Sequence, residues 1–267
     1  MEKRKFLVIV DPAHERHLAL ERMLDVIRQR RERVLEFHLL IGFESDDRSD
    51  PDTPDEIVRG NDWLRELLHP LDESGVDYTS ELFWTRNWRD SILNAIDRYA
   101  CDTIMLCESS AKNKRGITDS KWELVRRAKC DVVIVDKDTK APIECVLSAV
   151  NIQATDPVHK ALNERILERG KYLAEYFAAD FHVVNAYRDS EDFPDRELLV
   201  RMTGLPRENI HRDMGKAQDV IVGIAEQVKA DMVILGISNR KGLYAAFGGH
   251  TVEGVMEKIT VDVVALT

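Results

Sequence analysis

The segment from Gly236 to Lys258 contains the residue types that could bind an anion. It reads GISNRKGLYAAFGGHTVEGVMEK and begins at the end of an apolar run, Met232–Gly236. Gly236 and Gly242 allow close approach of the backbone and positive φ, and Arg240 adds positive charge between them. Free backbone N–H groups at the start of a helix favour phosphate. We therefore expect a phosphate site where a buried strand passes into the last helix of the chain.

The same segment continues with the residues expected to meet the anion. Gly248 and Gly249 precede His250 and Thr251, and an amphipathic run follows. This order predicts a helix that begins at about Thr251 and presents its first amides to a ligand. The alternative interpretation is that the glycines are only turn and cap residues.

Other catalytic and metal-binding motifs are not indicated. His14 and His17 lie three residues apart, which is not the spacing of a His-Glu-x-x-His zinc helix, and we expect both to be surface residues. The chain has no Gly-x4-Gly-Lys-(Ser/Thr) loop and no Gly-x-Ser-x-Gly elbow. We therefore predict a ligand-binding protein without a catalytic or metal-ligating set.

The residues that position this segment occur in an internal repeat. DSILNAIDRYACDTIML, from Asp90, corresponds to DVIVGIAEQVKADMVIL, from Asp219, and 129 residues also separate Asp102 from Asp231. Apolar residues recur at i, i+3, i+4 and i+7 in both copies, as on one face of a helix. A short apolar run follows each time, Thr103–Cys107 in the first copy. A helix followed by a buried strand, repeated once, predicts two copies of one α/β domain.

The remaining strands repeat in the same order. Apolar runs begin at Phe6, Val34 and Asp131 in the first half and correspond to runs that begin at Val146, Asp180 and Asp262 in the second half. Strands that alternate with helices predict two tandem doubly wound parallel-sheet domains. Ligands bind such folds at the carboxyl ends of the strands, where the strand order reverses. The residues expected at these ends are Asp11, Cys107, Asn151 and Gly236.

Composition and linkers bound the domain organisation and the partners. The charged, proline-containing stretch Asp136–Glu144 predicts a boundary between domains at 1–139 and 140–267. Loops are expected at Glu44–Glu56 and Tyr187–Glu197. The net charge of −10 disfavours nucleic acid and anionic membranes as partners. No apolar stretch approaches the roughly 20 residues of a membrane helix, and the four cysteines show no metal or redox spacing, so we expect reduced, buried thiols and a cytoplasmic protein.

The Gly236–Lys258 segment resembles the signature of the universal stress protein family, Gly-x2-Gly-x9-Gly-(Ser/Thr). Gly236 and Gly249 match the first and third glycines. Asn239 and His250 stand where the family has a glycine and a hydroxyl residue. The resemblance extends over essentially the whole chain, to tandem members of the family. It rests on ALNER from Ala161, RKGLYAAFGGHT from Arg240 and TDSKWELVRRAKCDVVIV from Thr118.

The resemblance implies an adenine-nucleotide alpha hydrolase-like fold and a stress-response protein that binds a small ligand without rapid turnover. The implied ligand is ATP or another adenine nucleotide at the second domain. The first domain lacks the glycine signature, since Cys107 stands at the position of Gly236. Asn151 would contact the nucleoside, and the residues expected around the phosphates are Gly236, Asn239, Arg240, Gly242, Gly249, His250 and Thr251.

Alternatives stay open at this stage. The protein could be a structural or interaction protein without nucleotide affinity, a binder of another phosphate-containing metabolite, or a slow ATPase. Single-domain members of the family pair through their last strands, which implies an internal pseudo-dimer through Asp131–Val135 and Asp262–Leu266. Association of two chains is left open.

Overall fold

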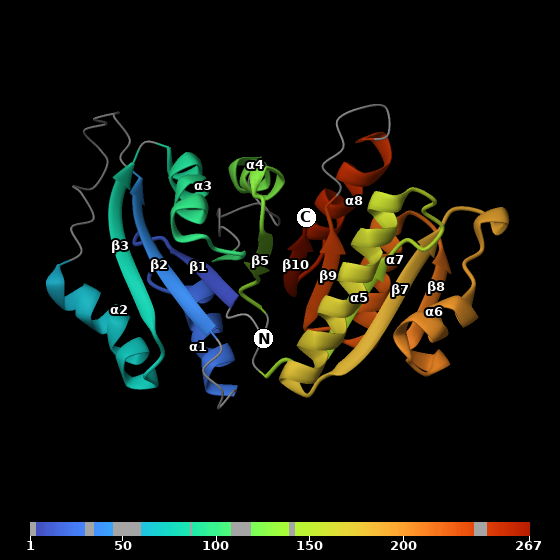
Figure 1. Ribbon diagram of the computed structural model, residues 1–267, viewed down its shortest axis with the longest axis horizontal. Coiled ribbons are helices and arrows are strands. Elements are labelled where there is room, and N and C mark those ends of the chain that lie inside the picture. Colours follow the sequence, from blue (N-terminus) through green and yellow to red (C-terminus); the bar gives the residue numbers. More distant parts are fainter. Residues whose placement is uncertain are drawn as a thin grey trace. The chain divides into compact units, whose positions relative to one another are not determined.

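The computed structural model describes residues 4–29, 35–44, 60–85, 87–107, 119–138, 142–237 and 245–267. Within those ranges, the side chains of residues 35, 43–44, 119–121, 192 and 245–250 are not described. The chain forms two compact units, Met1–Cys107 and Glu108–Thr267. Each unit is a parallel α/β structure, as the alternation of strand and helix patterns predicts (Figure 1).

Unit 1 contains four parallel strands in the order β3-β2-β1-β4. Its elements are β1 (Arg4–Val10), α1 (Leu18–Gln29), β2 (Leu35–Glu44), α2 (Asn61–Ser74), β3 (Tyr78–Thr85), α3 (Trp88–Tyr99) and β4 (Thr103–Cys107). The helix pattern predicted around Asp90 is confirmed, because Ile92, Ala95 and Ile96 of α3 are buried.

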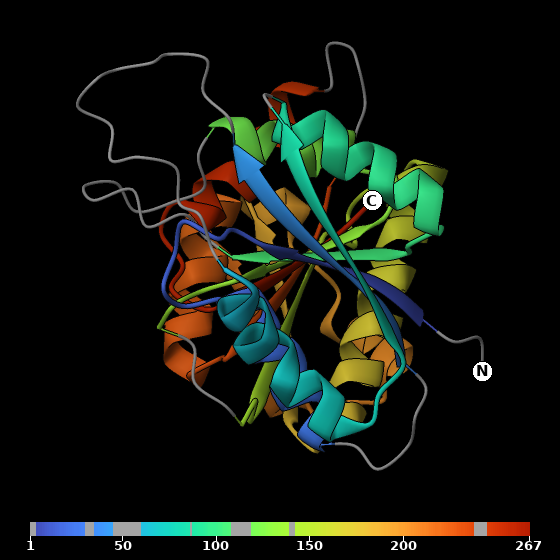
Figure 2. The same ribbon diagram turned by 90° about the vertical axis from the view of Figure 1, so that its left-hand side faces the viewer.

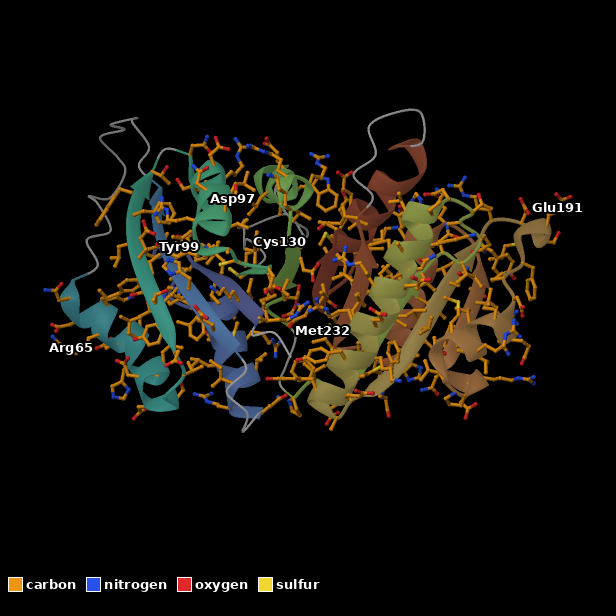
Figure 3. The ribbon with its side chains drawn as sticks, in the orientation of Figure 1. Arg65, Asp97, Tyr99, Cys130, Glu191 and Met232 are labelled. Atoms are coloured by element: carbon orange, nitrogen blue, oxygen red, sulfur yellow. The ribbon has the colours of Figure 1, made fainter. Side chains whose placement is uncertain are left out.

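Unit 2 contains five parallel strands in the order β10-β9-β6-β7-β8. Its elements are α4 (Asp119–Arg127), β5 (Asp131–Val135), β6 (Cys145–Val150), α5 (Pro157–Phe177), β7 (Asp180–Tyr187), η1 (Ser190–Asp192), α6 (Arg196–Thr203), η2 (Arg207–Asn209), β8 (Ile210–Met214), α7 (Ala217–Val228), β9 (Met232–Gly236), α8 (Ala245–Met256) and β10 (Asp262–Leu266). Met232, labelled in Figure 3, begins β9. The tandem doubly wound α/β fold predicted from the repeat is thus confirmed.

The two aligned aspartates hold equivalent strands together in the two units. In unit 1, the Lys5 N–H donates to the carboxylate of Asp102 (3.0 Å), and the Asp102 N–H donates to the Lys5 carbonyl (3.0 Å). In unit 2, the Cys145 N–H donates to the carboxylate of Asp231 (2.9 Å), and the Asp231 N–H donates to the Cys145 carbonyl (2.9 Å). Each aspartate therefore satisfies a backbone donor at the start of the neighbouring strand, where the ladder does not supply a partner.

The helices of unit 2 cover both faces of its sheet. Figure 2 shows α5 (yellow) and α7 (orange) on opposite sides of the strands. Right-handed crossovers place α6 on the face of α5 and α8 on the face of α7. The α5 face is tightly packed, because a Cβ on Gly170 would lie 2.2 Å from the Ser148 Oγ and 2.5 Å from the ring of Phe181. Odd-numbered residues of β7, including Phe181, therefore face α5.

Strand β5 belongs to unit 2. It pairs antiparallel with β10, with Val133 opposite Val264. The buried carboxylate of Asp131, at the start of β5, accepts from Arg169 of α5 (2.6 Å) and from Arg165 (3.2 Å). The compact units therefore divide at Cys107, whereas the boundary predicted between residues 139 and 140 follows the sequence repeat and stays a prediction.

The cysteines behave as small apolar residues. Cys101, Cys130 and Cys145 are buried, Cys107 is half-buried, and none forms a disulfide. Burial raises the pKa of the Cys101 and Cys145 thiols to about 11. Among the described residues, no helix is both long and apolar enough to cross a membrane.

Candidate functional site

The strand order of unit 2 reverses between β6 and β9. The chain moves outward from β6 to β7 and β8, then returns to β9 on the other side of β6 and continues to β10. Ser148 lies opposite Ile234 in the β6–β9 register, so both strands end at about the same level, at Val150 and Gly236. Such a reversal leaves a crevice outside the carboxyl ends of the strands, which is where doubly wound folds bind ligands. Asn151, directly after β6, lies at this rim as predicted.

Two buried amides hold the turn that follows β6. Asn163 of α5 accepts the Asn151 N–H (3.0 Å) and donates to the Asn151 carbonyl (2.7 Å). Asn185 of β7 accepts the Ile152 N–H (2.9 Å) and donates to the Gln153 side chain (2.8 Å). Asn163 is 7% exposed and Asn185 is fully buried. Because a buried amide is costly unless it is hydrogen-bonded, these two side chains fix the backbone of the turn.

The Asn151 side chain itself projects from this fixed turn. Asn151 is exposed, and its side-chain amide makes no hydrogen bond to any other described residue. An amide can donate and accept at once. The turn therefore presents a free donor and acceptor on a rigid support at the crevice.

The corresponding turn of unit 1 is built differently. Asp11 follows β1, and its own carboxylate accepts the Ala13 N–H (2.9 Å). The Asp11 side chain is therefore used to form its turn. Glu21 occupies the position of Asn163, because each follows the pattern His-x-Ala-Leu, which begins at His17 in unit 1 and at His159 in unit 2. Ile41 occupies the position of Asn185, because Ile41 is the register partner of Val10 as Asn185 is of Val150. Unit 1 has no supporting amides at these positions.

Gly236 has a packing reason to be glycine. A Cβ at this position would lie 2.6 Å from the Leu162 Cδ2 and 3.0 Å from the Ile166 Cδ1, both on α5. Gly236 does not use the positive φ that glycine allows, since the glycines with positive φ in the described residues are Gly75, Gly204 and Gly215. The close approach expected here is therefore an approach of helix α5 to strand β9.

The start of the last helix differs from the prediction. Helix α8 begins at Ala245, not near Thr251, so Gly249, His250 and Thr251 lie in its second turn. The N–H groups of a second turn are bonded within the helix and cannot receive an anion. The run Ala245, Ala246 and Phe247 is helical in the structure, in keeping with the strong helix propensity of alanine. The remaining predicted residues, Asn239, Arg240 and Gly242, lie outside the described ranges.

The charges near the carboxyl ends of β6 and β9 favour binding of an anionic group on the β9 side. The N-terminus of α5 is already capped by Asp156, whose carboxylate accepts the His159 N–H (3.1 Å) and lies 2.5 Å from the His159 Nδ1. A second negative charge there would be repelled. An anionic group bound at the crevice would therefore lie toward β9, and the neutral part of the ligand toward Asn151.

The supporting amides Asn163 and Asn185 were not predicted as site residues. Asn185 directly follows the apolar pair Val183 and Val184 in the strand DFHVVNAY, and Asn163 lies in the ALNER motif. An amide next to the apolar residues of a buried strand was the available signal. No three His, Cys, Asp or Glu side chains gather into a possible metal site in the described part of the chain.

Comparison with known proteins agrees with this architecture. Residues 195–266 match the family model described as "Universal stress protein family". The chain is 22% identical over 304 residues to a universal stress protein E homolog of Haemophilus influenzae, covering 100% of this chain and 98% of the relative. It is 23% identical over 296 residues to universal stress protein E of Escherichia coli K12, with coverages of 98% and 93%.

Solved structures share the fold. A putative universal stress protein from Pseudomonas aeruginosa superposes with a TM-score of 0.80 at 23% identity, covering 98% of this chain and 92% of that one. A universal stress protein from Archaeoglobus fulgidus gives a TM-score of 0.69 at 13% identity, with coverages of 100% and 97%. The chain therefore shares the fold of universal stress proteins, matches their family model at residues 195–266, and is similar to universal stress protein E along its whole length.

Proposed function

We propose that unit 2 binds an adenine nucleotide, ATP above all, at the carboxyl ends of β6 and β9 and does not turn it over rapidly. The observation that carries this proposal is the free Asn151 amide on a turn fixed by two buried asparagines. A group held rigidly before binding loses little entropy when the ligand docks. At the same position in unit 1, the Asp11 carboxylate already accepts the Ala13 N–H within its own turn.

The asymmetry between the units supports a single site in unit 2. Buried amides stabilise a fold only when all their bonds are made, so a pair of them at one turn is costly to keep without a use. They occur in unit 2 and not at the corresponding positions of unit 1. The cytoplasmic location expected from the sequence is part of the same proposal. The antiparallel β5–β10 pairing supports the further proposal of an internal pseudo-dimer.

Equilibrium dialysis of the full chain against ATP tests the proposal. We expect saturable binding that Asn151→Ala weakens about fivefold to tenfold, because one or two hydrogen bonds contribute about 1–1.5 kcal/mol. The melting temperature should not change, since the Asn151 side chain is exposed and bonds to no described residue.

The matched control is Asp11→Ala in unit 1. It removes a turn hydrogen bond and should lower stability by about 0.5–1 kcal/mol without changing ATP binding. No binding to the folded chain at millimolar ATP would overturn the proposal and favour a structural or interaction protein. Binding with steady phosphate release would instead favour the slow ATPase.

A further inference from the structure

Two arginines, Arg196 and Arg212, lie on neighbouring elements at the edge of unit 2, on the far side of β7 from the β6–β9 crevice. Arg196 is the first residue of α6, and Arg212 is in β8. Arg212 is the register partner of Asn185, so it projects from the face that α5 and α6 cover. Glu191, labelled in Figure 3, lies in the short helix η1 that leads into this region. The sequence predicted only a loop here, at Tyr187–Glu197.

Arg212 is positioned by neutral groups. Its Nη1 donates to the Pro194 carbonyl (2.8 Å), and its guanidinium carbon lies 4.4 Å from the centre of the Phe193 ring. The Phe193 ring meets the Tyr187 ring edge-on at 5.3 Å and is nevertheless 55% exposed. Stacking on an aromatic ring fixes the plane of a guanidinium and leaves its remaining N–H groups available.

The carboxylates nearby bind other arginines. Asp195 caps α6 by accepting the Glu197 N–H (2.8 Å) and lies 3.7 Å from Arg201. Glu197 pairs with Arg207 at 2.7 Å. Neither Arg196 nor Arg212 forms an ion pair with any described residue, and the Nε atom of each is buried without an acceptor. No described carboxylate is therefore paired directly with either guanidinium group, although Asp195 and Glu197 offset part of the Arg212 charge.

The surroundings of Arg212 lower its pKa on balance. Burial is the main cause and repulsion from Arg196 the next, whereas Tyr187, Asp195 and Glu197 act in the opposite direction. The charge of Arg196 also contributes to a lowered pKa of His211, after burial and His182. A bound anion would offset both the desolvation and the repulsion of the two arginines.

We propose that Arg196 and Arg212 form a binding site for a phosphomonoester dianion. Two adjacent cations match a dianion better than a single carboxylate charge, and guanidinium groups match phosphate oxygens geometrically. The exposed Phe193 ring gives the organic part of the ligand an apolar surface. The α6 N-terminus does not contribute, because Asp195 already occupies it. Strand β7 separates this site from Asn151, so the site does not depend on the nucleotide proposal.

Calorimetric titration of the full chain with phenyl phosphate at low salt tests this site. We expect saturable binding that Arg196→Gln weakens at least tenfold, because a hydrogen bond between charged groups contributes about 1.5–3 kcal/mol. Arg196→Lys should bind with intermediate affinity. Benzoate, which carries the same ring and one negative charge, should bind at least tenfold more weakly than phenyl phosphate.

Two control variants locate the effect. Arg201→Gln, also on α6, should bind phenyl phosphate like the parent chain, because Arg201 already has Asp195 as its partner. Asn151→Ala should also leave this binding unchanged, which separates the site from the nucleotide crevice. Thermal unfolding verifies that Arg196→Gln is folded. Unchanged affinity in a folded Arg196→Gln, or equal affinity for benzoate, would overturn the proposal.

Discussion

Replacement of Gly236 with alanine separates two explanations for a glycine at the end of β9. The added Cβ would lie 2.6 Å from the Leu162 Cδ2, 2.8 Å from the Leu162 Cγ and 3.0 Å from the Ile166 Cδ1. Carbon atoms in good contact are about 3.5–4.0 Å apart, so the overlap is about 1 Å at Leu162. If the glycine is present for packing, alanine must destabilise the fold in the absence of any ligand.

The expected magnitude follows from what can move. Overpacking a core costs about 1–3 kcal/mol. Ile166 is 3% exposed and cannot shift freely, but Leu162 is only half-buried and can turn partly outward. We therefore expect Gly236→Ala to lower the free energy of unfolding by about 1–2 kcal/mol, measured by urea unfolding of the full chain without nucleotide.

A matched glycine provides the control. A Cβ on Gly223, in α7, meets nothing within 4 Å. Alanine there should stabilise the chain by about 0.5–1 kcal/mol, because glycine is unfavourable inside a helix. Adding Leu162→Ala to Gly236→Ala should restore part of the lost stability, with a coupling of about 1 kcal/mol between the two sites.

The refuting result is a Gly236→Ala variant that is as stable as the parent or more stable. The Leu162 side chain would then move aside without lowering the free energy of unfolding, and packing would not explain the glycine. If the destabilised variant recovers with Leu162→Ala and still binds ATP, the glycine serves packing alone.

Three further predictions concern buried titratable groups. Burial is the main cause that lowers the pKa of His182 and of His211. The His182 Nδ1 lies 3.1 Å from the His211 Nε2. As the pH falls below the ordinary histidine pKa, the unfolded chain therefore binds more protons than the folded chain. Their contribution to stability is therefore complete above about pH 6.5 and is lost as the pH falls, and His211→Gln should flatten the rise in unfolding free energy between pH 5 and 7 by up to about 1.4 kcal/mol per pH unit. Asp131→Asn should cost about 2–3 kcal/mol in urea unfolding and speed amide exchange in β5, because it weakens the pair with Arg169. Cys145, with a thiol pKa of about 11, should react with iodoacetamide at pH 8 about a hundredfold more slowly than an unperturbed thiol.

A control for the Asp131 prediction comes from the same chain. Arg165→Gln removes the half-exposed partner of Asp131 and should cost less than Asp131→Asn. An unaltered pH slope in His211→Gln, unchanged β5 exchange in Asp131→Asn, or rapid native alkylation of Cys145 would each contradict its prediction.

The strands of the repeat could be predicted because their signals are local. Thr103–Cys107, Met232–Gly236 and Asp262–Leu266 are strands in the structure as the apolar runs indicated. The start of α8 could not be located in the same way. Glycine is tolerated inside a helix, so Gly248 and Gly249 do not mark the start of α8.

The candidate site could be predicted only in outline. Asn151 follows from the rule that ligands lie at the carboxyl ends of parallel strands. Its turn is held by bonds between Asn151 and Asn163, 12 positions apart, and between Ile152 and Asn185, 33 positions apart, and no periodicity describes these pairs. The histidines at equivalent register positions make the same point, because His38 contacts Thr79 and Tyr99 whereas His182 contacts His211.

The sequence by itself determined the duplication, the order of strands and helices in each copy, and the helix faces that are buried. These depend on the 3.6-residue period of helices and on continuous apolar runs in strands buried on both faces, which are properties of neighbouring residues. The tertiary structure decided which polar side chains are held, which are free and which charges lack a partner. The Asn151 side chain is free because two other elements fix the backbone of its turn. Arg196 and Arg212 lie on neighbouring elements because β8 returns beside α6. Such contacts depend on how distant segments cross, and the pattern along the chain does not encode them locally.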